Sequence, residues 1–250
     1  KRLAAQAIRD DGAITMADIE RLHHSKYDML GGDGLLCFER QSGLVGELAG
    51  GERLKHWLNG RRAAFLGNIP GLPAPKGVLL TGVQGCGKSF AARWLAAEWS
   101  LPLLRLDFGR LYNKYHGESE RNLREALRIA ESLAPCVLWI DEIEKGLAQD
   151  SGGEVDGGVS RRVLGTLLTW LSDRQHGCFI VATSNRIESL PPELIRKGRF
   201  DEIFFVDLPT AEIRAAILAT HLRRRQLDPQ HFDLPVLASA SDGFSGAELE

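Results

Sequence analysis

The sequence predicts an α/β protein built on a doubly wound, five-stranded parallel sheet. Two observations support this: short apolar segments alternate with amphipathic helical segments, and a glycine-rich loop joins one apolar segment to a helix. Such alternation is typical of parallel strands that are buried on both faces. The expected strands span 78–80, 102–107, 136–140, 178–183 and 203–206. The expected helices span 52–66, 90–99, 119–133, 159–171 and 211–224, and a further helix is expected to begin near Ser245.

Length and composition limit the number of domains and the classes of partner. The chain has 250 residues, of which 44% are hydrophobic, and its net charge is −2. This is enough for one large domain with a small appendage, and the charge alone does not favour nucleic acid or anionic lipid. No apolar run has the length of a membrane span, and no signal peptide is visible. The cysteines are far apart without metal-ligand spacing, so we expect a cytoplasmic protein without a membrane partner.

We expect three segments along the chain. Residues 1–42 are predicted to be a linker from a missing N-terminal region, with a helix starting at Met16. Residues 43–209 are predicted to form a large α/β subdomain. Residues 210–250 are predicted to be the truncated start of a small helical lid.

The glycine-rich loop predicts a phosphate site. Its glycines allow successive backbone N–H groups to point into one concavity, and the following helix adds the positive end of its dipole. Lys88 supplies a charge for the β- and γ-phosphates, and the Ser89 hydroxyl can bind Mg²⁺. The strand and helix on either side favour a P-loop over a chance glycine loop. The residues expected to bind nucleotide here are Gly82, Val83, Gln84, Gly85, Cys86, Gly87, Lys88, Ser89 and Phe90.

Two acids follow the apolar strand 136–140. Carboxyl ends of parallel strands meet at one edge of a sheet, so we expect Asp141 and Glu142 to lie beside the phosphate loop. Asp141 can hold Mg²⁺ there, and Glu142 can polarise the water that attacks the γ-phosphate. The competing interpretation is an ordinary polar strand end before a turn.

Polar residues near the last two strands are less specific. Asn185 ends the strand 178–183 and could orient the same water, although Ser-Asn is also common in turns. Arg196 and Arg199 precede the last strand. They could belong to a surface turn, or they could reach the γ-phosphate in a neighbouring subunit. Spacing alone does not decide between these alternatives.

The order of these motifs resembles an AAA ATPase domain, from about Gly43 to Glu250. Residues 82–89 resemble the Walker A motif and residues 137–142 resemble Walker B. The remaining matches are Asn185 as sensor 1, Arg196 and Arg199 as the paired arginine fingers, and Gly246 with Ala247 in the start of the sensor 2 helix. The resemblance implies ATP and Mg²⁺ as cofactors and a homo-hexamer with ATP between subunits.

The resemblance also implies an adenine contact and a pore loop. Leu48 and Ala49 lie where the family has Asp-Ile-Gly-Gly beside adenine, with Ala49 in place of a glycine. Tyr115, His116 and Gly117 lie in a stretch that resembles the first pore loop, whose aromatic residue grips polypeptide in the central channel. His116 departs from the usual apolar residue, and Tyr115 could instead pack at a strand-to-helix turn. A second pore loop would fall at 149–158.

A finer resemblance is to the stand-alone AAA ATPases of the hypothetical chloroplast frame type. Residues 134–145, 160–163, 169–171 and 197–208 carry it. The expected function is a ring-forming remodeller that threads protein substrates. The alternative is a nucleotide-switched regulatory or scaffold ATPase that acts on a partner protein or on nucleic acid.

Overall fold

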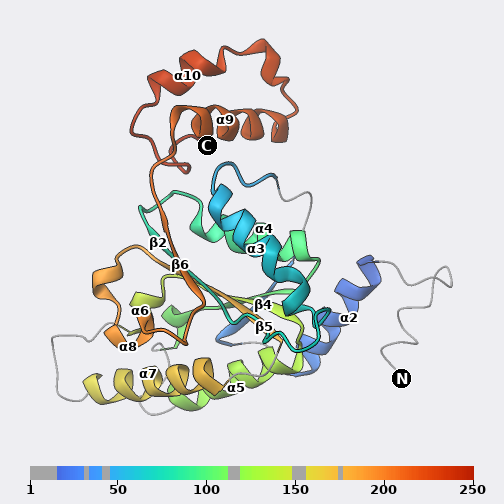
Figure 1. The fold of residues 1–250 in the computed structure, drawn as a ribbon, viewed down its shortest axis with the longest axis vertical. Helices are drawn as coiled ribbons and strands as arrows, with labels where there is room; N and C mark the ends of the chain where they lie inside the picture. The colour runs from blue at the N-terminus through green and yellow to red at the C-terminus, as the bar shows by residue number, and fades with distance from the viewer. Residues whose placement is uncertain (1–15, 31–33, 41–45, 112–118, 148–155, 174–176) are drawn as a thin grey trace.

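The computed structural model describes residues 16–30, 34–40, 46–111, 119–147, 156–173 and 177–250, and within them a six-stranded sheet forms the centre (Figure 1). The strand order is β1-β3-β4-β5-β2-β6. Strands β2 to β6 are parallel, as predicted, and β1 runs antiparallel to β3 at one edge. The strands are β1 Leu36–Glu39, β2 Gly77–Gly82, β3 Leu103–Leu106, β4 Cys136–Ile140, β5 Cys178–Ser184 and β6 Glu202–Val206.

Strand β1 corrects the predicted count of five strands. It lies inside residues 1–42, which we expected to be a linker, so the sheet begins before residue 43. Of its four residues Leu36 alone is buried, because β1 pairs with β3 on one side only. A four-residue edge strand has no long apolar run or clear alternation, so the sequence pattern did not reveal it.

Helices cover both faces of the sheet, which makes the fold doubly wound (Figure 1). Successive residues of β4 point to opposite faces: Val137 packs with α3 and α4, whereas Leu138 packs with α5 and α7. Each face is therefore a separate apolar layer. The helices are α2 Met16–Met29, α3 Glu52–Phe65, α4 Lys88–Trp99, α5 Ser119–Ser132, α6 Ile143–Leu147, α7 Asp156–Asp173, α8 Pro192–Ile195, α9 Ala211–Arg224 and α10 Leu234–Ala240. None of the helices in the described ranges has the length and apolarity to span a bilayer.

The C-terminal helices α9 and α10 pack together outside the sheet (Figure 1). The guanidinium of the buried Arg214 holds them, donating to the carbonyl oxygens of Pro209 and Ala238 at 2.9 Å each. Residues 246–249 form turns, and the helix expected to begin near Ser245 stays a prediction. The Ser245 amide and hydroxyl both donate to the carboxylate of Glu248, and the chain bends towards the P-loop.

The short helix α6 packs against a 3₁₀ turn, Phe108–Arg110, through a glycine. A Cβ on Gly146 would overlap the ring of the buried Phe108. Only a residue without a side chain allows this close approach.

We expect Gly146→Ala to lower the free energy of unfolding by about 1–3 kcal/mol, as overpacking of a filled core does. Gly165→Ala is the matched control, because that glycine lies in α7 with no atom within 4 Å of the added methyl group. It should stabilise the protein by up to about 1 kcal/mol through helix propensity. Urea unfolding of both variants measures this, and equal stabilities would contradict the packing argument.

Candidate active site

The P-loop connects the end of β2 to the start of α4. Gly82, Gly85 and Gly87 all have positive φ, in a region that glycine adopts readily and other residues rarely do. Gly85 has a second constraint, because a Cβ there would lie 2.8 Å from the Ser245 hydroxyl. The loop therefore needs glycine for its own turn and for the segment that lies over it.

Lys88 is folded beneath this loop. Its ammonium group donates to the carbonyl oxygens of Gly82 at 2.9 Å and Val83 at 2.7 Å. Burial lowers the pKa of Lys88, while nearby carboxylates, including Asp141, act in the opposite direction. The loop thus holds a cation at its inner side, where phosphate oxygens would be bound.

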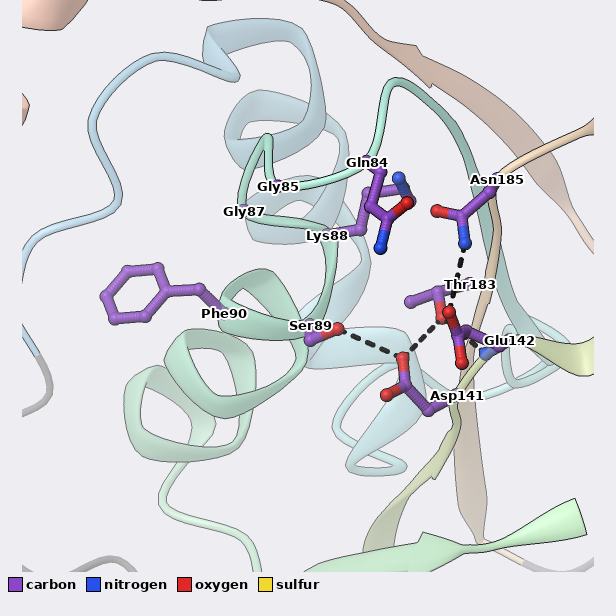
Figure 2. A pocket seen from close by; sticks show the side chains of 10 residues that line it. All are labelled: Gln84, Gly85, Gly87, Lys88, Ser89, Phe90, Asp141, Glu142, Thr183 and Asn185. Carbon is purple, nitrogen blue, oxygen red and sulfur yellow. Dashed lines mark hydrogen bonds between the residues drawn. The ribbon is translucent and has the colours of Figure 1, made fainter. Parts of the chain in front are cut away.

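Asp141 links three elements at the floor of the site (Figure 2). One of its oxygens, Oδ1, accepts hydrogen bonds from the Ser89 hydroxyl at 3.0 Å and from the Thr183 hydroxyl at 2.7 Å. A hydroxyl and a carboxylate are the oxygen ligands that Mg²⁺ prefers, and Mg²⁺ usually takes its remaining ligands from phosphate and water. Ser89 and Asp141 therefore fit the metal predicted from the sequence.

Glu142 lies beside Asp141 in a strained backbone conformation, with φ 47°. Its amide donates to the Thr183 hydroxyl at 2.9 Å, which holds the turn after β4 against β5. Its Oε1 atom accepts a hydrogen bond from the Asn185 side chain at 3.1 Å (Figure 2). The two residues expected to handle the attacking water are thus in direct contact.

Helix α6 adds two charged residues to this arrangement. Glu144 accepts the backbone N–H of Asn185 at 2.9 Å, and Lys145 forms an ion pair with Oε2 of Glu142. The hydrogen bond to Glu142 raises the pKa of Lys145. Both oxygens of the Glu142 carboxylate are therefore occupied.

The P-loop and the polar residues that follow β4 and end β5 line one cavity of about 250 Å³ (Figure 2). All of its lining residues except Thr183 were predicted from the sequence. The lining residues are Gln84, Gly85, Gly87, Lys88, Ser89, Phe90, Asp141, Glu142, Thr183 and Asn185. Gly82 and Val83 contribute backbone carbonyl groups to Lys88 instead, and Cys86 does not line the cavity, although burial raises the pKa of its thiol.

The C-terminal segment after α10 contacts the P-loop directly. The amide of Ala247 donates to the carbonyl oxygen of Gly85 at 3.0 Å, and a Cβ on Gly246 would lie 3.1 Å from the same oxygen. The guanidinium of Arg224 lies over the ring of Phe90, 5.6 Å from its centroid. The structure therefore brings the predicted sensor 2 residues to the phosphate loop, although neither lines the cavity.

The predicted adenine contacts, Leu48 and Ala49, lie near α9 rather than at the phosphates. The adjacent Gly50 approaches Ile213 so closely that a Cβ there would lie 2.8 Å from its side chain. Leu48 is buried with the core of the α3 and α4 face. An adenine contact from these two residues stays a prediction.

The paired arginines differ from each other in their contacts. Arg196 is exposed and has no side-chain partner within the described ranges, whereas Arg199 donates to the hydroxyl of Ser172 at the end of α7. Neither lines the cavity of its own chain. Their predicted role in a neighbouring site stays a prediction.

The predicted pore-loop residues Tyr115, His116 and Gly117 lie outside the described residues, as does most of 149–158. The described flanks of the first stretch are joined, because the Ser119 hydroxyl donates to the carbonyl oxygen of Leu111 at 3.0 Å.

The fold and the glycine loop are those of a P-loop nucleoside triphosphatase. The family model described as "ATPase family associated with various cellular activities (AAA)" matches residues 78–208, and the chain belongs to this family of ATPases.

Relatives make the assignment narrower. The chain is 42% identical over 253 residues to the "Uncharacterized AAA domain-containing protein ycf46" of Guillardia theta. The alignment covers all of this chain and 50% of that protein. The protein of that name from Trieres chinensis is 43% identical, over 100% of this chain and 50% of its own length. The one from Gracilaria tenuistipitata var. liui is 46% identical, over 79% of this chain and 40% of its own length. The chain spans about half the length of these relatives, and the resemblance to the hypothetical chloroplast frame type is confirmed.

Sequence reasoning missed three polar residues at the site. The sequence predicts only a strand end at Thr183, although a hydroxyl next to Ser184 and Asn185 is a signal for a polar site. Glu144 and Lys145 follow the paired acids directly, but no spacing showed that a turn would bring them back to Asn185 and Glu142.

We expect Thr183→Val to lower the ATP turnover rate by about 10- to 100-fold, as loss of a group that orients metal ligands does. The valine removes one of the two donors to Asp141, so that only Ser89 remains, and it leaves the Glu142 amide without its acceptor. Thr183→Ser keeps the hydroxyl and is the matched control. ATPase rates across a Mg²⁺ titration measure the effect, and equal rates in both variants would contradict it.

Proposed function

We propose that this protein is an ATP-hydrolysing member of a homo-hexameric ring that remodels protein substrates threaded past a pore loop. The observation that supports the chemistry is the convergence of two pairs, Ser89 with Asp141 and Asn185 with Glu142, in one cavity beside Lys88. The first pair suits a metal ion and the second suits a water molecule.

Each residue has a separate role in the proposed reaction. Lys88 and the P-loop amides bind the phosphates, and Ser89 with Asp141 hold Mg²⁺, which neutralises phosphate charge when bound. Glu142 accepts the proton of the attacking water as the new bond to phosphorus forms and ADP leaves. Asn185 contacts Glu142 and so is placed to orient that water.

The proposed ring is needed to complete the site. Arg196 is exposed and away from the cavity of its own chain, so its cation is available to a neighbour's γ-phosphate. Arg199 is half-buried and bound to Ser172. We therefore favour Arg196 as the arginine that reaches the γ-phosphate of the neighbouring subunit. A cation supplied in this way stabilises the charge of the transferring phosphoryl group.

A mixing experiment tests this contribution between subunits. Lys88→Ala should not bind ATP productively. Arg196→Ala should hydrolyse ATP more slowly than the unmodified protein, by a factor of about 10³ or more if the arginine acts as a finger. In a mixed ring, the Lys88→Ala subunit supplies Arg196 to an intact P-loop, so part of the activity should return. A Lys88→Ala, Arg196→Ala double variant is the control partner, and no recovery in the first mixture would contradict the proposal.

The threading part of the proposal rests on the resemblance of residues 114–120 to a pore loop. Along the chain, this stretch follows the 3₁₀ turn Phe108–Arg110 and leads into helix α5, which begins at Ser119. An aromatic residue on such a loop would contact polypeptide in the channel of a ring.

We expect Glu142→Gln protein to hold ATP and to retain polypeptides on affinity purification, because it binds nucleotide but lacks the base. Lys88→Ala should retain none, and adding Tyr115→Ala to Glu142→Gln should release them. Mass spectrometry and a nucleic-acid assay on the same eluate provide the readout. Nucleic acid, or one stoichiometric partner indifferent to Tyr115, would contradict threading and favour the regulatory alternative.

A further inference from the structure

Lys145 binds the residue that we assign as the general base. Its backbone N–H donates to the carbonyl oxygen of Glu142 at 2.8 Å, and its ammonium group forms an ion pair with Oε2 of the same residue. The two residues are three apart at the turn into α6, so the short turn brings the cation back to the carboxylate.

This ion pair restricts what the carboxylate can do. Oε1 accepts a hydrogen bond from Asn185, and Lys145 occupies the second oxygen, Oε2. Neither oxygen of the carboxylate is therefore free of a partner. A general base must turn one oxygen to the water from which it takes a proton. The Lys145 side chain is 65% exposed, so it can move into solvent without leaving a buried charge behind.

We propose that Lys145 is a positioning residue that restrains Glu142, and that ATP hydrolysis stays below its maximum until this ion pair opens. The inference rests on the proposed function, because it requires Glu142 to be the base. The ion pair between Lys145 and Glu142 would thus regulate the site from within the same chain.

Helix α6 also provides a route by which the contact can be opened. Gly146 follows Lys145 directly and lies against the ring of Phe108, without room for even a methyl group. Phe108 is buried and belongs to the 3₁₀ turn that follows β3. Because cores are closely packed, a displacement of this turn moves α6 and with it Lys145.

The test compares steady-state ATP hydrolysis of the full chain with that of five variants at matched oligomeric state. Lys145→Met removes the cation, and Lys145→Arg keeps it. Arg128→Met removes a cation from another exposed ion pair of the same spacing, with Glu125 at 2.7 Å, on α5. The fourth variant carries Lys145→Met together with Glu142→Gln, and the fifth carries Glu142→Gln alone as its reference.

We expect Lys145→Met to raise kcat about two- to fivefold and to leave KM for ATP unchanged. This factor corresponds to the free energy of an exposed ion pair, which the variant no longer has to break. Lys145→Arg and Arg128→Met should match the unmodified protein, and the double variant should show no gain. An unchanged or lower kcat in Lys145→Met would overturn the inference. If Glu142→Gln alone hydrolyses ATP normally, the proposed function itself fails, so the two failures are distinguishable.

Discussion

The register of the parallel strands β2, β5 and β4 is the constraint on which the site depends. Ile140 pairs with Ala182, and Thr183 pairs with Leu80, so the strand ends lie at one edge of the sheet. β4 and β5 are buried along their whole length, and a slip of one residue would reverse which face each side chain meets. The apolar layers thereby hold Asp141 and Glu142 next to Thr183.

The polar groups at this edge are arranged around shared atoms. One oxygen of Asp141 serves both Ser89 and Thr183, and the Thr183 hydroxyl serves both acids. Glu142 adopts a backbone conformation that costs about 1–3 kcal/mol in comparable cases, and the buried sheet beneath it can sustain this. The site is therefore positioned by the core and not by the loops alone.

The distribution of contacts also suggests where control of hydrolysis lies. The C-terminal segment after α10 reaches the P-loop through Ala247 and Gly85, and α6 reaches Glu142 through Lys145. One contact lies at the phosphate loop and the other lies at Glu142. The site is thus joined to two separate parts of the molecule, the C-terminal segment and α6.

The sequence by itself determined the five parallel strands, the P-loop and the pair Asp141 and Glu142, because each is marked by local periodicity or by fixed spacing along the chain. Only the tertiary structure decided the antiparallel strand β1, the role of Thr183, the contact of Lys145 with Glu142 and the turn at 246–249. The long-range features depend on strand register and on packing between distant segments, as when the Ala247 amide bonds to Gly85. The Lys145 contact depends on the conformation of a turn. Neither long-range packing nor the conformation of such a turn has a periodic signal in the sequence. Both arise only when the core has fixed the positions of the strands.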